Sequence, residues 1–173
     1  VFDQDSGGQY YYHAHRDGEH GHFHTFLRAR GIPAGIAPLP APHASAPWPQ
    51  GDDALSHLMA ISMDRHGFPK ALFATNRWVT DETWYAADDV IAMLDHYVID
   101  HAFPSWPVNR WISAMLVLFR PHIEVLLRHR DAVVAWHQHR APTRDVFEDR
   151  ALETTGSLDV SVDDWLSQLH AAV

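Results

Sequence analysis

Histidine is concentrated in one short stretch of this chain. Five of the 15 histidines fall between positions 13 and 24, in the sequence HAHRDGEHGHFH. Neutral imidazole is a preferred ligand of the divalent transition metals, and because the chain has no cysteine, any metal must be held by histidine nitrogen and carboxylate oxygen. We therefore expect a divalent transition metal, Zn, Fe, Cu or Mn, to bind at this stretch.

A β-hairpin is the element that would bring these histidines together. Asp17-Gly18 lies between two aromatic-rich runs, and this dipeptide is a strong signal for a tight turn between strands. We predict a hairpin over residues 9–26, in which His13 faces His22 and Tyr11 faces His24. Side chains alternate along a strand, so one face would carry all five histidines, with cross-strand Cβ atoms roughly 5 Å apart. These predicted metal ligands are His13, His15, His20, His22 and His24.

The register of the hairpin decides this prediction. A turn of two or four residues pairs His15 with His20 and keeps the five histidines on one face. A three-residue loop would pair Arg16 with His20 and place the two histidine sets on opposite faces. In the first register the other face is aromatic or small and is expected to pack against helices; its residues are Tyr10, Tyr12, Ala14, Gly21, Phe23 and Thr25.

The leading functional hypothesis is a metal-dependent enzyme of unknown reaction. Three histidine ligands would leave one coordination position open, so that the metal could activate water or dioxygen or polarise an oxygen of a small-molecule substrate. Glu19, beside the turn, is the candidate acid or base, with a metal ligand or an ion pair to Arg16 as its other readings. Arg28 or Arg77 would be available to an anionic substrate.

Two other classes of function remain open at this stage. The protein could be a non-catalytic metal-binding protein, in which the ion stabilises the hairpin or is itself the cargo. It could also be a partner-binding domain, in which the aromatic hairpin forms an interface and the histidines bind no metal. An open coordination position facing a cavity would favour the enzyme.

The rest of the chain divides by its pattern. Residues 31–51 contain six prolines without a strand or helix period and predict a long irregular loop, which could form a pocket or a lid. Residues 57–78 predict a second hairpin, and residues 86–173 carry apolar side chains at helical spacing. We expect one α+β domain over residues 1–173, with an antiparallel sheet of about four strands packed by about four helices.

Composition excludes several classes of partner. The net charge is -9 over 173 residues, so the chain has no basic surface suited to nucleic acid or anionic lipid. No apolar run is long enough to span a bilayer, and no signal peptide is visible, which favours a cytoplasmic protein. The first residues, Val1-Phe2-Asp3-Gln4, suggest that an N-terminal segment is missing. Oligomeric state does not follow from the sequence.

Gly7, His13, His15 and Glu19 fit the first cupin signature, which is a glycine, five residues, HxH, three residues and a glutamate. This pattern resembles half of the metal site in β-barrel dioxygenases and lyases. The resemblance is partial, because Phe26 stands where the signature has a glycine and the chain contains no second cupin signature.

A longer resemblance covers most of the chain. The segments YYYHAHRDGEHGHFHTFLR, ALFATNRWVTDETW and NRWISAMLVLFRP resemble an uncharacterised family of bacterial proteins, a domain of unknown function. In that family a further segment precedes the hairpin. The resemblance implies a bacterial source and no particular activity.

Overall fold

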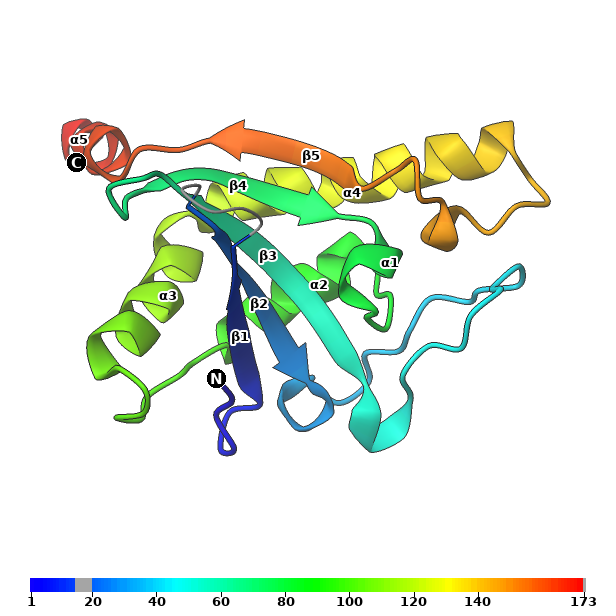
Figure 1. Ribbon diagram of the computed structural model, residues 1–173, viewed down its shortest axis with the longest axis horizontal. Helices are drawn as coiled ribbons and strands as arrows, with labels where there is room; N and C mark the ends of the chain where they lie inside the picture. Colours follow the sequence, from blue (N-terminus) through cyan, green and yellow to red (C-terminus); the bar gives the residue numbers. More distant parts are fainter. Residues whose placement is uncertain (15–19, 173) are drawn as a thin grey trace.

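The protein is built on one antiparallel sheet with helices on one of its faces. The computed structural model describes residues 1–14 and 20–172, and within them five strands pair in the order β1-β2-β3-β4-β5 (Figure 1). The strands are β1 (Gly8–His13), β2 (His22–Arg28), β3 (Leu55–Met63), β4 (Pro69–Thr75) and β5 (Thr154–Asp159). The α+β class expected from the sequence is confirmed.

Helices follow the first four strands in the chain. They are α1 (Arg77–Thr80), α2 (Ala87–Met93), α3 (Trp106–Leu118), α4 (Arg120–Arg140) and α5 (Val162–Ala171). Figure 1 shows α2, α3 and α4 behind the sheet, with α4 running along β4 and β5. Pro121 lies in the first turn of α4, where its missing N–H needs no partner, and α3 ends just before it, as expected.

Both predicted hairpins are present in the sheet. β1 pairs with β2 and β3 pairs with β4, each antiparallel. Asp64 closes the second turn, because its Oδ1 accepts the backbone N–H groups of His66 and Phe68, and Gly67 adopts the positive φ of 84° that this turn requires. Local turn chemistry therefore specifies this connection.

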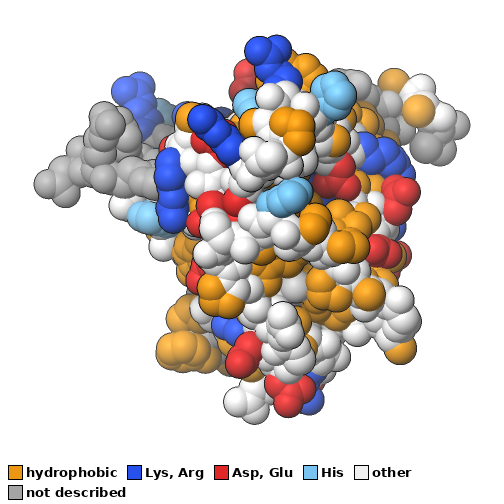
Figure 2. Space-filling view, turned by 90° about the vertical axis from the view of Figure 1, so that its right-hand side faces the viewer, with side chains coloured by type: hydrophobic (Ala, Val, Ile, Leu, Met, Phe, Trp, Pro, Cys, Tyr) orange, Lys and Arg blue, Asp and Glu red, His pale blue; other side chains and the backbone are white. Residues whose placement is uncertain are grey.

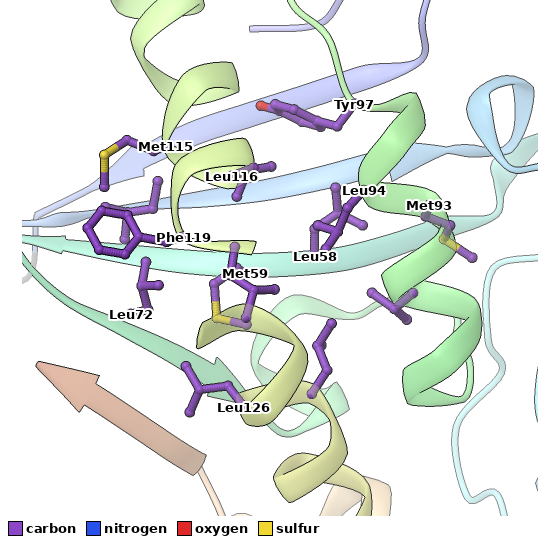
Figure 3. Packing of buried hydrophobic residues seen from close by; sticks show 14 of the residues in the cluster. Leu58, Met59, Leu72, Met93, Leu94, Tyr97, Met115, Leu116, Phe119 and Leu126 are labelled. Atoms are coloured by element: carbon purple, nitrogen blue, oxygen red, sulfur yellow. The ribbon is translucent and has the colours of Figure 1, made fainter. Parts of the chain in front are cut away.

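The core lies between the sheet and the helices. Figure 3 shows Met115 and Leu116 of α3, together with Phe119 just after it, gathered against the buried side chains of β3 and β4. Burying each such side chain stabilises the fold by about 1.5–3 kcal/mol relative to leaving it in water. The aromatic face of the first hairpin also belongs here, since Tyr10 is buried and Phe23 packs edge to face against it.

The structure adds a fifth strand in the part of the chain that the sequence analysis assigned wholly to helices. β5 pairs with the outer edge of β4 and packs against α4. Gly156 permits this close approach, because a Cβ atom there would lie 2.8 Å from Cδ2 of His129. The strand contains one large apolar residue, Leu158, so it shows none of the hydrophobic alternation by which strands are recognised.

The proline-rich segment is irregular, as expected. Only two short 3₁₀ turns, Ala29–Gly31 and Gly51–Asp53, flank it. In Figure 1 it extends to the right of the sheet, and Figure 2 views the molecule from that side, where hydrophobic side chains cover much of the middle and lower surface. Among the described residues, no helix has the length and apolar character needed to cross a membrane.

Candidate functional site

The first hairpin has the register that the sequence predicts. Tyr11 lies opposite His24, and His13 lies opposite His22. The imidazole centroids of His13 and His22 are 5.6 Å apart, and those of His22 and His24 are 4.6 Å apart. Three of the five predicted ligands therefore lie side by side on the face of the sheet opposite α2, α3 and α4. We call this face the histidine face.

A fourth ring, which the sequence analysis did not select, joins this row from β3. His57 Nε2 lies 3.0 Å from His24 Nδ1, and both residues are buried. Burial holds the pKa of His57 well below its usual value, and the positive charge that His24 and Arg130 would place nearby lowers it further. The His57 ring is therefore neutral around pH 7, and the pair is joined by one ring N–H.

Glu82 fixes the backbone behind this pair. Its Oε2 accepts the N–H of His57 at 2.7 Å, and its Oε1 accepts the hydroxyl of Thr80 at 3.0 Å. Burial raises the pKa of Glu82 to about 7, although Arg130 and these hydrogen bonds act in the opposite direction. Glu82 is buried and is not among the residues that line a cavity near the histidines. It therefore acts on the histidine face through the backbone of β3.

A pocket of about 640 Å³ lies over the histidine face. Its described lining comes from the hairpin, from β3, β4 and β5, and from α1. The lining residues are Tyr11, His13, His20, His22, His24, Ser62, Phe73, Thr75, Trp78, Val79, Glu153, Thr154 and Ser157. We call this space the histidine pocket. Four of the five predicted ligands line it, and the described lining contains no lysine or arginine.

Two of the predicted site residues cannot be placed. His15 and Glu19 lie outside the described residues, as does the Asp17-Gly18 turn between them. His20 is described and exposed, and it lines both the histidine pocket and a smaller apolar cavity beside α3. Within the described part of the chain, no three histidine, aspartate or glutamate side chains are already arranged to hold a metal ion.

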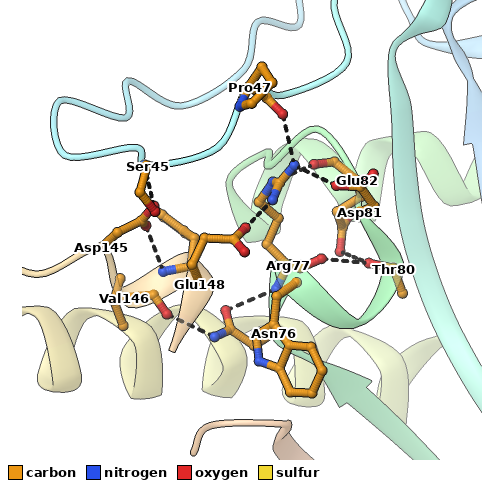
Figure 4. Close-up of polar contacts among 12 residues, drawn as sticks. Ser45, Pro47, Asn76, Arg77, Thr80, Asp81, Glu82, Asp145, Val146 and Glu148 are labelled. Atoms are coloured by element: carbon orange, nitrogen blue, oxygen red, sulfur yellow. Dashed lines mark hydrogen bonds and ion pairs between the residues drawn. The ribbon is translucent and has the colours of Figure 1, made fainter. Parts of the chain in front are cut away.

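Arg77 has a structural role that excludes it from substrate binding. Its side chain is 1% exposed, and the guanidinium forms ion pairs with Asp81 and Glu148. It also donates to the carbonyl oxygens of Glu82 at 3.0 Å and Pro47 at 3.1 Å (Figure 4). The expectation that Arg77 meets an anionic substrate is wrong, because its polar hydrogens are used inside the protein.

The other elements proposed for the pocket lie elsewhere. Arg28 donates to the side chain of Gln9 at 2.8 Å and lines a separate cavity at the far end of β2. The proline-rich segment lines a cavity of about 850 Å³, together with Thr83 and Tyr85, and contributes no residue to the described lining of the histidine pocket. In the described structure, the segment is therefore not a wall of this pocket.

Comparison with protein families gives a match over most of the chain. Residues 1–160 match the family described as a domain of unknown function (DUF6969). The chain belongs to this family. The DUF6969 match covers the sheet and helices α1 to α4, and it confirms the resemblance to an uncharacterised family. Searches of curated proteins and of solved structures gave no significant match.

Proposed function

We propose that this DUF6969 protein is a metal-dependent enzyme whose histidine pocket binds a divalent transition metal. His13, His20, His22 and His24 are the ligand candidates from the described residues, and the sequence adds His15 and, as acid or base, Glu19. One observation carries the proposal: His13, His22 and His24 stand side by side at the wall of a pocket. Such a row of imidazoles is suited to zinc, iron or copper.

Metal binding requires a small rearrangement of these side chains. Ligand nitrogens lie about 2 Å from zinc, so rings whose centroids are 4.6–5.6 Å apart must turn toward a common point. His13 and His20 are exposed and can rotate about their side-chain torsions without disturbing the core. His24 is buried, so it would be the fixed ligand to which the others adjust.

The contact between His24 and His57 supports a ligand role for His24. Metal-bound histidines commonly donate their second ring N–H to a neighbouring acceptor, which fixes the tautomer and the ring orientation. When His24 Nδ1–H donates to His57 Nε2, the lone pair of His24 resides on Nε2, the nitrogen through which a metal can be bound. His57 is then a positioning residue, because it acts through His24.

The adjoining pocket favours an enzyme over a protein in which a structural metal only stabilises the hairpin. A structural metal needs protein ligands at every position and no neighbouring space, whereas a catalytic metal keeps a position for water or substrate. The histidine pocket, at about 640 Å³, is large enough for a small molecule. A metal there would activate water or dioxygen or polarise a substrate oxygen.

Elemental analysis of the protein, purified without an affinity tag, tests the metal site. We expect near-stoichiometric zinc, iron, copper or manganese in the wild type and a loss of at least tenfold in the double variant His13→Ala/His22→Ala. The matched control is His96→Ala/His170→Ala, which removes two exposed histidines that do not line the pocket and should leave the metal content unchanged. Absence of metal after reconstitution with all four ions would overturn the proposal.

A second measurement separates the enzyme from the non-catalytic alternative. Cobalt(II) substituted at the site reports its coordination through visible absorption, and azide is a small anion that enters an open position. We expect azide to change the spectrum of the cobalt protein. An unchanged spectrum at saturating azide would mean that protein side chains fill the coordination sphere, and the non-catalytic function would replace the enzyme.

A further inference from the structure

The wall of the histidine pocket opposite the hairpin contains a buried hydroxyl group to which no described residue hydrogen bonds. This group is Oγ1 of Thr75, a residue that is 2% exposed and lines the pocket at the end of β4, with the Oγ1 atom itself shielded from solvent. A buried hydroxyl left without a hydrogen bond costs roughly 1–3 kcal/mol. Natural proteins retain such groups chiefly where a ligand or an ordered water completes them.

The same wall contains an acidic residue. Glu153 immediately precedes β5, and Thr154 is the first residue of that strand. Both line the pocket together with Thr75, and Thr154 pairs with Thr75 in the sheet. Glu153 is the one acidic residue in the described lining, which contains no lysine or arginine. An anionic group placed here would be repelled, and an ammonium group would be attracted.

An indole ring forms the third side of this wall. Trp78 of α1 lines the pocket, and its Nε1 donates to the carbonyl oxygen of Leu152 at 2.9 Å, which holds the ring in place. The guanidinium of Arg150 stacks on the same ring, 4.5 Å from its centroid, without lining the pocket. An aromatic ring beside hydroxyl and carboxylate groups is suited to a compact molecule with C–H and polar groups.

We propose that Thr75, Glu153 and Trp78 form a substrate subsite for a small amino alcohol or a similar hydroxyl-bearing amine. Rotation of the Thr75 side chain would bring its shielded Oγ1 to the pocket, where it would hydrogen bond to a hydroxyl group, and Glu153 would pair with the ammonium group. The inference rests on the proposed function, since it names the substrate class of the same pocket. The subsite lies on the wall formed by β4, β5 and α1, so its binding can be measured without a metal.

Three probes of equal size and different charge test the subsite: 3-amino-1,2-propanediol, glycerol and glycerate. Binding is measured by NMR titration of the whole chain after chelation with EDTA, so that glycerate cannot bind through a metal. We expect the amine to bind about threefold more tightly than glycerol, as is typical of a solvent-exposed charge pair. Glycerate should bind most weakly of the three.

Two variants assign the contacts. Glu153→Gln should remove the preference for the amine, whereas Asp159→Asn, an equal change of charge on β5 outside the pocket, should preserve it. Thr75→Val should weaken all probes that bind through a hydroxyl by about fivefold, the cost of one hydrogen bond, and Thr75→Ser should restore them.

Equal affinity for the amine and glycerate, or an amine preference that survives Glu153→Gln, would overturn the subsite. Glu153 is exposed, so its variant keeps the test valid even where Thr75→Val fails to fold. Failure here, in a protein that holds metal by elemental analysis, would leave the metal site in place with another substrate class. Probe binding by a protein that takes up none of the four metals on reconstitution would instead overturn the metalloenzyme and retain the subsite.

Discussion

Two polar clusters lie near the same edge of the sheet, and they differ in where their hydrogen bonds go. Around Arg77, every contact is made to another part of the protein, from the proline-rich segment to the turn after α4. In the histidine pocket, by contrast, imidazoles and Thr75 line a space, and no described residue hydrogen bonds to Thr75 Oγ1. The first arrangement is that of a structural network, and the second is that of a binding site.

This difference teaches how to interpret charged residues in an uncharacterised protein. Arg77 looks suited to substrate binding when only its residue type is considered, yet its guanidinium is satisfied within the fold. Buried polar groups are almost always paired, so the informative groups are those directed at a cavity. The comparison makes opposite predictions for variants in the two clusters.

The largest expected effect belongs to the Arg77 network. Arg77→Ala should lower the free energy of unfolding by about 3–5 kcal/mol, because it removes the donor to Glu148 Oε1 and to two carbonyl oxygens inside the protein. Urea unfolding followed by circular dichroism measures this loss. Arg128→Ala is the matched control: it breaks the exposed ion pairs with Asp88 and Glu124 and should cost less than about 1 kcal/mol. Equal small losses in both variants would contradict the structural role of Arg77.

Glu82 should give the protein a pH-dependent stability. Its pKa rises from 4.5 in the unfolded chain to about 7 in the folded protein, so the folded state binds more protons between these values. The contribution of Glu82 to stability therefore falls as pH rises from 4.5 to 7, by on the order of 3 kcal/mol in total. Glu82→Gln removes the titratable group, and the amide oxygen of glutamine can still accept the N–H of His57.

Urea unfolding of the wild type and Glu82→Gln at pH 5, 6, 7 and 8 isolates this term. The lowered pKa of His57 changes stability in the opposite direction in the acid range, since His57 must remain neutral in the fold while the unfolded chain takes up a proton. That contribution cancels in the difference between the two proteins. We expect Glu82→Gln to gain stability relative to wild type as pH rises. A difference that stays constant with pH, as expected for the exposed control Asp159→Asn, would show that Glu82 is ionised throughout.

The local part of this fold could be predicted from the sequence. The register of the first hairpin is correct because the Asp17-Gly18 signal and the period of two leave little freedom, and the face bearing His13, His22 and His24 follows from it. α2 and α4 likewise carry clear apolar periods. These features depend on residues close together in the chain.

The remainder depends on contacts between distant segments. β5 forms because it pairs with the edge of β4 and packs against α4. Its sequence, TTGSLD, carries no strong strand signal of its own. His57 stands in an apolar run, where one histidine suggests a core residue, and its contact with His24 crosses from β2 to β3. Thr75 and Glu153 are brought to one pocket only by the pairing of β4 with β5. Composition and spacing could therefore not reveal this wall of the pocket.

The smallest of these effects tests how the buried rings prepare the pocket. His57→Phe fills the same space without a hydrogen-bond acceptor, so the ring of His24 loses the partner of its Nδ1. Removal of such a partner typically lowers metal affinity by about 10- to 100-fold, and we expect this range for the bound metal in competition with a chelator. The imidazole ¹⁵N shifts of His24 should at the same time show a mixture of tautomers in the metal-free variant. His43→Phe, in the proline-rich segment, should change neither measurement. Wild-type metal affinity in His57→Phe would mean that His57 does not orient His24. The position of His24 in the pocket lining would then be the remaining support for its role as a metal ligand.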